Sequence, residues 1–366
     1  MTTATKRLPL LDLLRGIAIL GTLASNIWLF AAPGGEASVL DAPMPGLLDD
    51  PIAFVTRFLA NGKFLSTLTI LFGAGLAIQF AAAARHGRRW PGRYLGRAGF
   101  LFVEGALHFV LVFAFDVLMG YAVVAVTVAF LLNRSERTRR VVGWTAVTVH
   151  LAVMALLTMA PSVGGSGADP EVVALYRDGD WWSQVLFRLD NAAVFRIEPV
   201  LTFGLLVTLF LTGVRLFRAG AFGDDATGRR LRHRMTVWGL GIGLPLNLAT
   251  SLAGERWFFV DRYVAAPVLA LGVIGLAARL TRSGRFSAAL SRLGRMAMSG
   301  YVAQNLVAAL CCYGFGLGLA SAGFAGSAWV VALWAAISAG LLLWSTLWLR
   351  RFSAGPLETV QKRLLR

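Results

Sequence analysis

Charged residues are scarce in this sequence. Asp, Glu, Lys and Arg make up 15% of the 366 residues, whereas hydrophobic residues make up 57%. A soluble domain needs far more charge on its surface, and no stretch of the chain is long and polar enough to form one. Apolar runs of about twenty residues recur from end to end, the length at which a helix crosses a bilayer. We therefore predict an all-α integral membrane protein, with residues 1–366 in a single multi-pass domain.

Cysteine is nearly absent, and so are several motifs of soluble enzymes. The two cysteines, Cys311 and Cys312, are neighbours in an apolar run, so they cannot form a disulfide framework. The GxxxxGK phosphate-binding loop, the HExxH motif and the Cys and His spacings of zinc sites do not occur. We expect no bound metal ion. No convincing internal repeat is present either, so self-similarity gives no support to a repeated transporter fold.

The net charge of +16 does not indicate a nucleic-acid partner. Lys and Arg occur in short clusters between apolar runs rather than on an amphipathic face, and such clusters mark the cytoplasmic ends of membrane helices. The loops between them are richer in Asp and Glu. This alternation predicts about ten crossings with both termini in the cytoplasm. Arg-rich loops flank Ala98–Leu132 on both sides, which requires an even number of crossings, so we divide that run into two helices near Asp116.

The predicted helices are apolar runs bounded by charged, Pro-containing or Gly-containing loops. They cover Leu10–Ala32, Phe64–Ala84, the two halves of Ala98–Leu132, Val141–Ala160, Val200–Phe217, Thr236–Ala253, Trp257–Ala278, Met296–Ala320 and Ala328–Leu349. An interfacial segment is expected over Ile52–Lys63. Residues 161–199 form the longest loop, which we place outside the cytoplasm. In this loop Trp181, Trp182, Val185, Leu186 and Leu189 recur at helical spacing, which predicts an amphipathic helix in the membrane interface.

The run Gly99–Leu118 holds three ionisable side chains, Glu104, His108 and Asp116, in a segment otherwise suited to hydrocarbon. Each costs about 2.5–3.5 kcal/mol at the bilayer centre, so such groups usually face a partner, a cavity or a reaction. Glu104 and His108 are four residues apart and share one helix face. His108 can then act as a general base while Glu104 fixes its tautomer. The alternative is a polar pair that packs two helices together.

Asp116 follows His108 by about 12 Å along a straight helix, so we expect no direct contact between them. It either lines the outer mouth of a cavity or caps the turn. Asp12 and Arg15 lie one turn apart near the inner end of the first helix, where they form a salt bridge or hold an anionic ligand.

Uncharged polar residues mark two further helices. Asn26 lies on the outer half of the first helix, and Tyr301, Gln304 and Asn305 lie in the first turns of the ninth. Such side chains either bond neighbouring helices together or line a site shared with His108. In the second case, the imidazole lines a chamber that solvent can reach and that connects the two membrane faces.

Four segments resemble the DUF418, or YeiB-like, membrane proteins. They are LDLLRGIAILGTLASNI at 11–27, KFLSTLTILFGAGLAIQ at 63–79, EGALHFVLVFAFDVLMGYA at 104–122 and GRMAMSGYVAQNL at 294–306. That family is similar to a wider group of transmembrane acyltransferases, which includes the acyltransferase-3 proteins and the lysosomal heparan N-acetyltransferase. In acyltransferase-3 proteins a His stands eleven residues after the Arg that matches Arg15, and here that position is Asn26. The resemblance therefore implies that a catalytic role moves to His108.

The resemblance implies an acyltransferase of the bacterial cytoplasmic membrane. It would move an acyl group from cytoplasmic acyl-CoA to a small-molecule, glycan or lipid acceptor, with Arg15, Arg89 and Arg93 attracting the CoA phosphates. A transporter or flippase is the alternative, with Asp12, Glu104, His108 and Asp116 forming a polar route. A third interpretation is a scaffold or sensor whose buried charges only fix packing. Membrane lipids are the expected surroundings, and the sequence leaves a homo-oligomer open.

Overall fold

The computed structural model describes residues 8–39, 45–160, 169–280 and 284–365, and over these ranges every regular element is helical. The helices are α1 (Pro9–Ala31), α2 (Pro51–Ala60), α3 (Lys63–Arg85), α4 (Arg93–Leu111), α5 (Leu118–Leu132), α6 (Glu136–Met159), α7 (Pro170–Asp178), α8 (Trp181–Asp190), α9 (Ala192–Phe195), α10 (Ile197–Leu201), α11 (Phe203–Arg218), α12 (Ala226–Trp238), α13 (Leu244–Leu252), α14 (Phe258–Val260), α15 (Ala266–Leu280), α16 (Arg285–Arg295), α17 (Ala297–Cys312), α18 (Ala328–Arg351) and α19 (Pro356–Leu364). The predicted all-helical class is confirmed.

Seven helical segments in the described part of the chain are long and apolar enough to cross a membrane. They are Pro9–Ala31, Pro51–Arg85, Arg93–Leu111, Glu136–Met159, Ala226–Leu252, Glu255–Arg279 and Ala328–Arg351. An eighth is formed if Ala192–Leu201 and Phe203–Arg218, which meet at a bend of 48°, count as one span. The shorter apolar helices α5 and α17 occupy the places of two more predicted crossings. The chain is thus a membrane protein, while the count of ten and the sidedness of the termini stay predictions.

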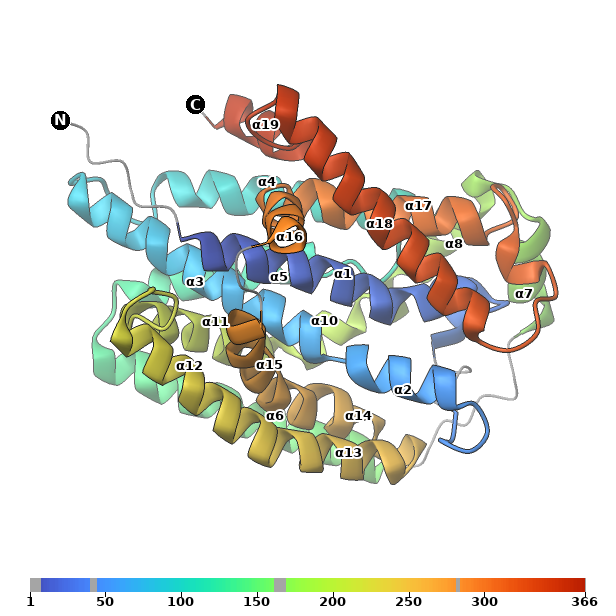
Figure 1. The fold of residues 1–366 in the computed structure, drawn as a ribbon, viewed down its shortest axis with the longest axis horizontal. Coiled ribbons are helices and arrows are strands. Elements are labelled where there is room, and N and C mark those ends of the chain that lie inside the picture. Colours follow the sequence, from blue (N-terminus) through green and yellow to red (C-terminus); the bar gives the residue numbers. More distant parts are fainter. Residues whose placement is uncertain (1–7, 40–44, 161–168, 281–283, 366) are drawn as a thin grey trace.

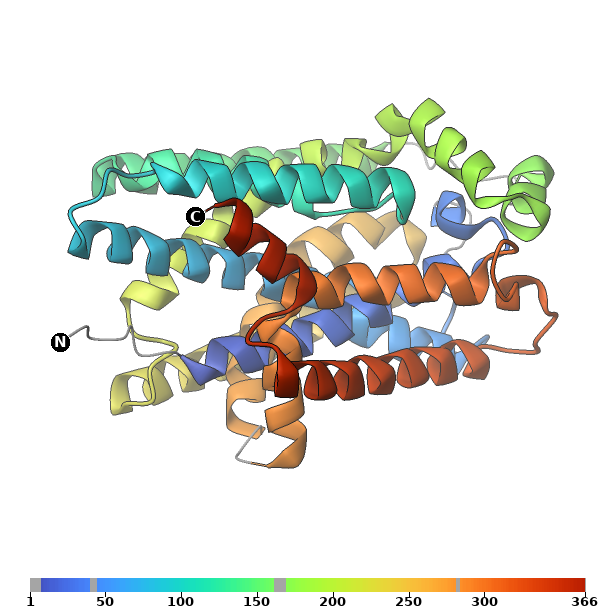
Figure 2. The same cartoon turned by 90° about the horizontal axis from the view of Figure 1, so that it is seen from above.

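The long helices run side by side in a bundle (Figure 1). Helix α1 lies inside it and packs against α3, α16, α17 and α18. Figure 2 shows α16 across, rather than along, the long axis of the bundle. This crossing depends on glycine, because a Cβ on Gly294 would lie 1.7 Å from the Asp12 carbonyl oxygen and one on Gly16 would lie 2.0 Å from that of Leu290. Small residues of this kind let membrane helices approach closely.

One predicted segment is helical and one predicted helix boundary differs from the structure. The predicted interfacial segment Ile52–Lys63 overlaps the helix α2, which joins α3 through a short break at Gly62, where φ is +70°; its placement in the interface stays a prediction. The ninth predicted helix, Met296–Ala320, ends early, because α17 stops at Cys312 and Tyr313 is extended. The next residue, Gly314, then packs so closely against α7 that a Cβ would lie 1.8 Å from the Arg177 carbonyl oxygen.

The predicted division of Ala98–Leu132 is confirmed, since α4 ends at Leu111 and α5 begins at Leu118. The expected amphipathic helix is also present, as α8. Its Val185 is 1% exposed, whereas Trp182 is 56% exposed, so one side of α8 packs on the protein. Its placement in the membrane interface stays a prediction.

Candidate functional site

The turn between α4 and α5 folds Asp116 back onto His108. Asp116 Oδ2 lies 2.9 Å from His108 Nδ1, and both side chains are almost completely buried. The expectation of no direct contact was wrong, because it assumed a straight helix and α4 ends between the two residues. Asp116 also accepts hydrogen bonds through Oδ1 from the backbone amides of Leu118 (2.8 Å) and Met119 (3.2 Å). It therefore caps α5, as one of the two alternatives proposed.

Glycine makes this fold-back possible. Gly105 lies one turn before His108 on α4, facing the returning chain. A Cβ at this position would lie 2.7 Å from Asp116 Oδ1 and 2.7 Å from the Met119 amide nitrogen. Any side chain here would push the turn outward and separate the carboxylate from the imidazole.

The hydrogen bonds fix the tautomer of His108. An ionised carboxylate only accepts, so Nδ1 carries the proton that is shared with Asp116. Nε2 is then an acceptor, and its neighbour is Asn305 Nδ2 at 3.3 Å. Asn305 Oδ1 in turn accepts from Asn26 Nδ2, also at 3.3 Å. The chain Asp116–His108–Asn305–Asn26 thus links the α4–α5 turn, α4, α17 and α1 in one polar network.

Two other predicted site residues lie on α17. The ring of Tyr301 lies 5.2 Å from the His108 ring, measured between centroids, so Tyr301 belongs to the surroundings of the imidazole. Gln304 instead donates to Thr22 Oγ1 of α1 at 3.2 Å, and its own Oε1 has no hydrogen-bond partner within the described residues. Asn26, Tyr301 and Asn305 are therefore gathered around His108, whereas Gln304 bonds α17 to α1.

The predicted pairing of Glu104 with His108 was wrong. Both residues are buried on the same helix, but the imidazole bonds to Asp116. Neither oxygen of Glu104 has a hydrogen-bond partner in the part of the chain that the structure describes. Buried polar groups are nearly always satisfied, so an unpartnered carboxyl group one turn from His108 is a feature that packing does not explain.

Asp12 and Arg15 form a salt bridge within α1, one of the two alternatives predicted for them, with Arg15 Nη1 3.3 Å from Asp12 Oδ1. The Arg15 side chain is 29% exposed, so its guanidinium stays accessible. The loop residues Arg89 and Arg93 are exposed, and an anionic ligand can therefore approach all three arginines. No cluster of three His, Cys, Asp or Glu side chains suited to a metal ion occurs in the described ranges.

Residues that the sequence analysis missed hold the α4–α5 turn from outside. Glu36 is fully buried and accepts from the backbone amide of Ala114 at 2.9 Å. Arg188 Nε lies 2.5 Å from Glu36 Oε1, and Arg188 Nη1 donates to the Val110 carbonyl at 2.8 Å. The Tyr176 hydroxyl donates to Glu36 Oε1 at 3.1 Å. Burial and the Glu36 carboxylate raise the pKa of Tyr176 well above its ordinary value, so it remains a donor.

Arg196 holds the same turn from another side. Its Nη1 donates to the Asp116 carbonyl at 2.8 Å and to that of Ala114 at 3.4 Å, and its guanidinium lies 5.1 Å from the Phe109 ring centroid. Among these missed residues, Arg188 had a sequence signal. It shares a helical spacing with Gln184 and Val185, which places it on the buried face of α8.

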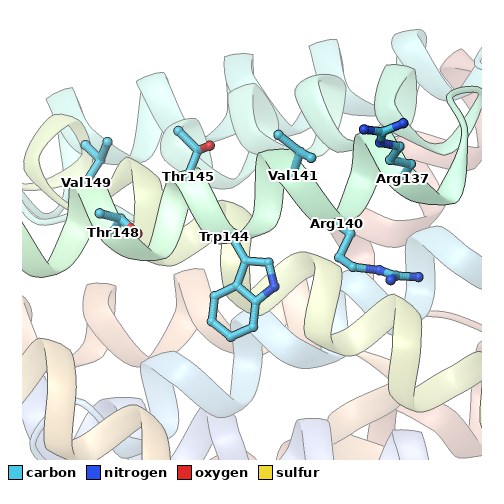
Figure 3. A pocket seen from close by; sticks show the side chains of 7 residues that line it. All are labelled: Arg137, Arg140, Val141, Trp144, Thr145, Thr148 and Val149. Atoms are coloured by element: carbon cyan, nitrogen blue, oxygen red, sulfur yellow. The ribbon is translucent and has the colours of Figure 1, made fainter.

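The surface formed by the described residues includes two grooves. One has a volume of about 440 Å³ and runs along α6 from Arg137 and Arg140 past Trp144 to Val149 (Figure 3). All of its lining residues belong to α6. The other has a volume of about 390 Å³, lies where α4, α5 and α11 meet, and is lined by Arg196 and Met119 among others. The second groove is therefore the one that adjoins the α4–α5 turn.

Comparison with known proteins gives three matches. Residues 216–366, which include α17, match the model of a family described as "Protein of unknown function (DUF418)". The chain is 24% identical over 384 residues to the uncharacterized protein YxaH of Bacillus subtilis (strain 168), covering 98% of this chain and 94% of that protein. It is 27% identical over 381 residues to the uncharacterized protein YeiB of Escherichia coli (strain K12), covering 97% and 95%.

Proposed function

The chain belongs to the DUF418, or YeiB-like, family, and we propose that it is an acyltransferase of the cytoplasmic membrane. The acyl donor is cytoplasmic acyl-CoA, and the acceptor lies in the membrane or beyond it. The observation that carries the proposal is the buried contact of 2.9 Å between Asp116 and His108. A carboxylate on Nδ1 orients an imidazole, leaves Nε2 as the base and stabilises the imidazolium that forms.

The reaction needs one base and no redox step. His108 Nε2 takes the proton of an acceptor hydroxyl, whose oxygen attacks the carbonyl carbon of the thioester. The new C–O bond forms, the C–S bond breaks, and the CoA thiolate leaves and receives the proton from the imidazolium. Asn305 Nδ2 lies 3.3 Å from His108 Nε2, near the upper distance limit for a hydrogen bond. The acceptor hydroxyl therefore has only a weak contact to displace. The ring is buried and lines neither groove, so the acceptor hydroxyl reaches Nε2 when the packing around the ring opens, and the predicted chamber that solvent can reach stays a prediction.

The surrounding residues fit this chemistry. Asn26 occupies the position of the histidine in acyltransferase-3 proteins, and it lies one amide, Asn305, away from His108. Glu104 and Gln304 contribute buried oxygens that have no hydrogen-bond partner in the described ranges, and these can bind a polar substrate. The exposed Arg89 and Arg93, with Arg15, can bind the phosphates of CoA.

The test is thioester turnover by the purified full-length protein in lipid nanodiscs. CoA released from acetyl-CoA and from longer acyl-CoAs is measured with a thiol reagent. We expect His108→Gln to lower turnover by about 10²–10⁴-fold, the usual contribution of a general base. The matched control is His150→Gln, because His150 is also buried but bonds the Tyr263 carbonyl, at 2.9 Å. If no acyl-CoA binds or turns over, or if both variants lose the same activity, the proposal fails.

A transporter or flippase is the second candidate, and one observation favours it. The contacts Thr22–Gln304 and Asn26–Asn305 follow each other along the interface of α1 and α17 and lead to His108. Such a series can form a polar route for a substrate. This function predicts flux into sealed proteoliposomes without a covalent product, whereas the acyltransferase forms an ester and releases CoA.

A further inference from the structure

We propose that an anionic phospholipid whose headgroup carries a hydroxyl binds in the groove between α4, α5 and α11, with its phosphate on Arg196, and that this lipid is the acyl acceptor. Its role as acceptor depends on the proposed acyltransferase function, whereas its binding does not. Nothing in the matches to known proteins assigns a ligand to this groove.

The walls of the groove are apolar and face outward. They include Phe102 of α4, Met119 and Val123 of α5, Val200 of α10 and Phe203 of α11. Phe102 is 41% exposed, Val123 47% and Val200 68%, so these side chains contact hydrocarbon rather than the protein interior. A volume of about 390 Å³ holds part of one lipid chain and its headgroup linkage. A ligand can therefore enter from the bilayer without crossing the bundle.

Arg196 is the one charged residue among those that line this groove. Within the described part of the chain its hydrogen bonds both start from Nη1, so Nη2 and Nε have no hydrogen-bond partner there. The two carboxylates that could neutralise Arg196 already have other hydrogen-bond partners. Asp116 bonds His108, and Glu198 accepts from the Tyr263 hydroxyl at 2.6 Å. A guanidinium beside hydrocarbon is costly without an anion, and its planar fork matches two oxygens of a phosphate.

The groove is connected to the His108 network by single contacts. Met119 lines the groove, and its amide donates to Asp116 Oδ1 at 3.2 Å. Arg196 donates to the Asp116 carbonyl at 2.8 Å. A phosphate bound by Nη2 and Nε of Arg196 is therefore linked through this one side chain to Asp116, whose carboxylate orients the imidazole. The groove on α6 also has arginines, Arg137 and Arg140, but no residue of the His108 network lines it, so it serves as the comparison.

Lipid binding is measured by native mass spectrometry of the full-length protein in detergent, titrated with phosphatidylglycerol or phosphatidylcholine. We expect Arg196→Gln to weaken phosphatidylglycerol binding by about tenfold, the loss of roughly one charge-assisted hydrogen bond. Arg196→Lys should restore part of it. The control Arg140→Gln should leave binding at this groove unchanged. Val123→Trp fills the groove from its exposed side and should weaken binding while Arg196 and its contacts to the turn remain.

Several outcomes overturn the proposal. Equal losses in Arg196→Gln and Arg140→Gln would mean that the lipid responds to surface charge in general. Equal affinity for phosphatidylcholine would remove the role of an anionic headgroup. Displacement of the lipid by millimolar inorganic phosphate or glycerol phosphate would mean that the site binds free phosphate. Unchanged binding in Val123→Trp would place the lipid chain elsewhere.

Failure of this inference can be told apart from failure of the proposed function. If phosphatidylglycerol binding depends on Arg196 but acyl-CoA is never turned over, the lipid site stands and the acyltransferase does not. If turnover depends on His108 but lipid binding ignores Arg196, the acyltransferase stands with another acceptor.

Discussion

Replacing Asp116 by asparagine is the sharpest perturbation of the site, because it keeps the shape and removes the charge. In the Asp116→Asn variant the amide oxygen can still accept from the backbone amides of Leu118 and Met119, as Asp116 Oδ1 does now at 2.8 and 3.2 Å. The new NH₂ group then faces His108 Nδ1, so Nδ1 must accept and the proton must move to Nε2. An imidazole protonated at Nε2 cannot take a proton from an acceptor hydroxyl.

The expected effects follow from that change of tautomer. Turnover of acyl-CoA should fall by about 10⁴-fold, as wrong tautomers do in hydrolytic triads. Stability should fall by about 1.5–3 kcal/mol, the contribution of one hydrogen bond to a charged group. Nitrogen-15 NMR of histidine-labelled protein reports the tautomer directly, and the sequence has only 4 histidines to resolve. The same His108 tautomer in wild type and variant, or unchanged turnover, would refute the reasoning.

Three further predictions concern the supports of the site. Gly105→Ala should lower the free energy of unfolding by about 1–3 kcal/mol through overpacking, because the new Cβ would lie 2.7 Å from the returning turn. The control is Gly99→Ala on the same helix, where a Cβ would have nothing within 4 Å, and its thermal unfolding should match that of the wild type. Glu36→Gln should cost about 3–5 kcal/mol by leaving the buried Arg188 without its partner, and a paired Glu36→Leu, Arg188→Met variant should recover most of it. Asp50 caps α2 by accepting from the Ala53 amide, which lowers its pKa, so its contribution is present above the ordinary carboxyl pKa and is lost as the pH falls through the lowered one. Asp50→Asn keeps the cap, and its melting temperature should therefore depend less on pH between about pH 5 and 2; an equal dependence would contradict this assignment.

Part of the candidate site could be predicted from the sequence, and physical chemistry explains why. An ionisable group in an apolar run is rare enough to be noticed, and His108 and Asp116 were identified in this way, whereas Asn305 was identified as an uncharged polar residue in a membrane helix. The division between α4 and α5 also followed from the positions of Arg-rich loops. These features depend on local composition, which a single sequence displays directly.

The partners of those residues could not be predicted, because they depend on tertiary contacts. Helical spacing favoured Glu104 as the neighbour of His108, but the fold-back of Asp116 depends on how α4 ends and on the small size of Gly105. The turn is held by Glu36 and Arg196, which are distant in sequence. Their role is set by packing between segments that are distant in sequence, and no periodicity in either segment encodes it.

The most direct test of the account is to look for the covalent product. Wild-type protein in phosphatidylglycerol-containing proteoliposomes is incubated with carbon-13 acetyl-CoA, and the lipids are examined by mass spectrometry beside the His108→Gln and His150→Gln variants. The account predicts acetylated lipid with the wild type and with His150→Gln, and a loss of about 10²-fold or more with His108→Gln. Equal labelling with both variants, or release of CoA that does not depend on His108, would contradict it.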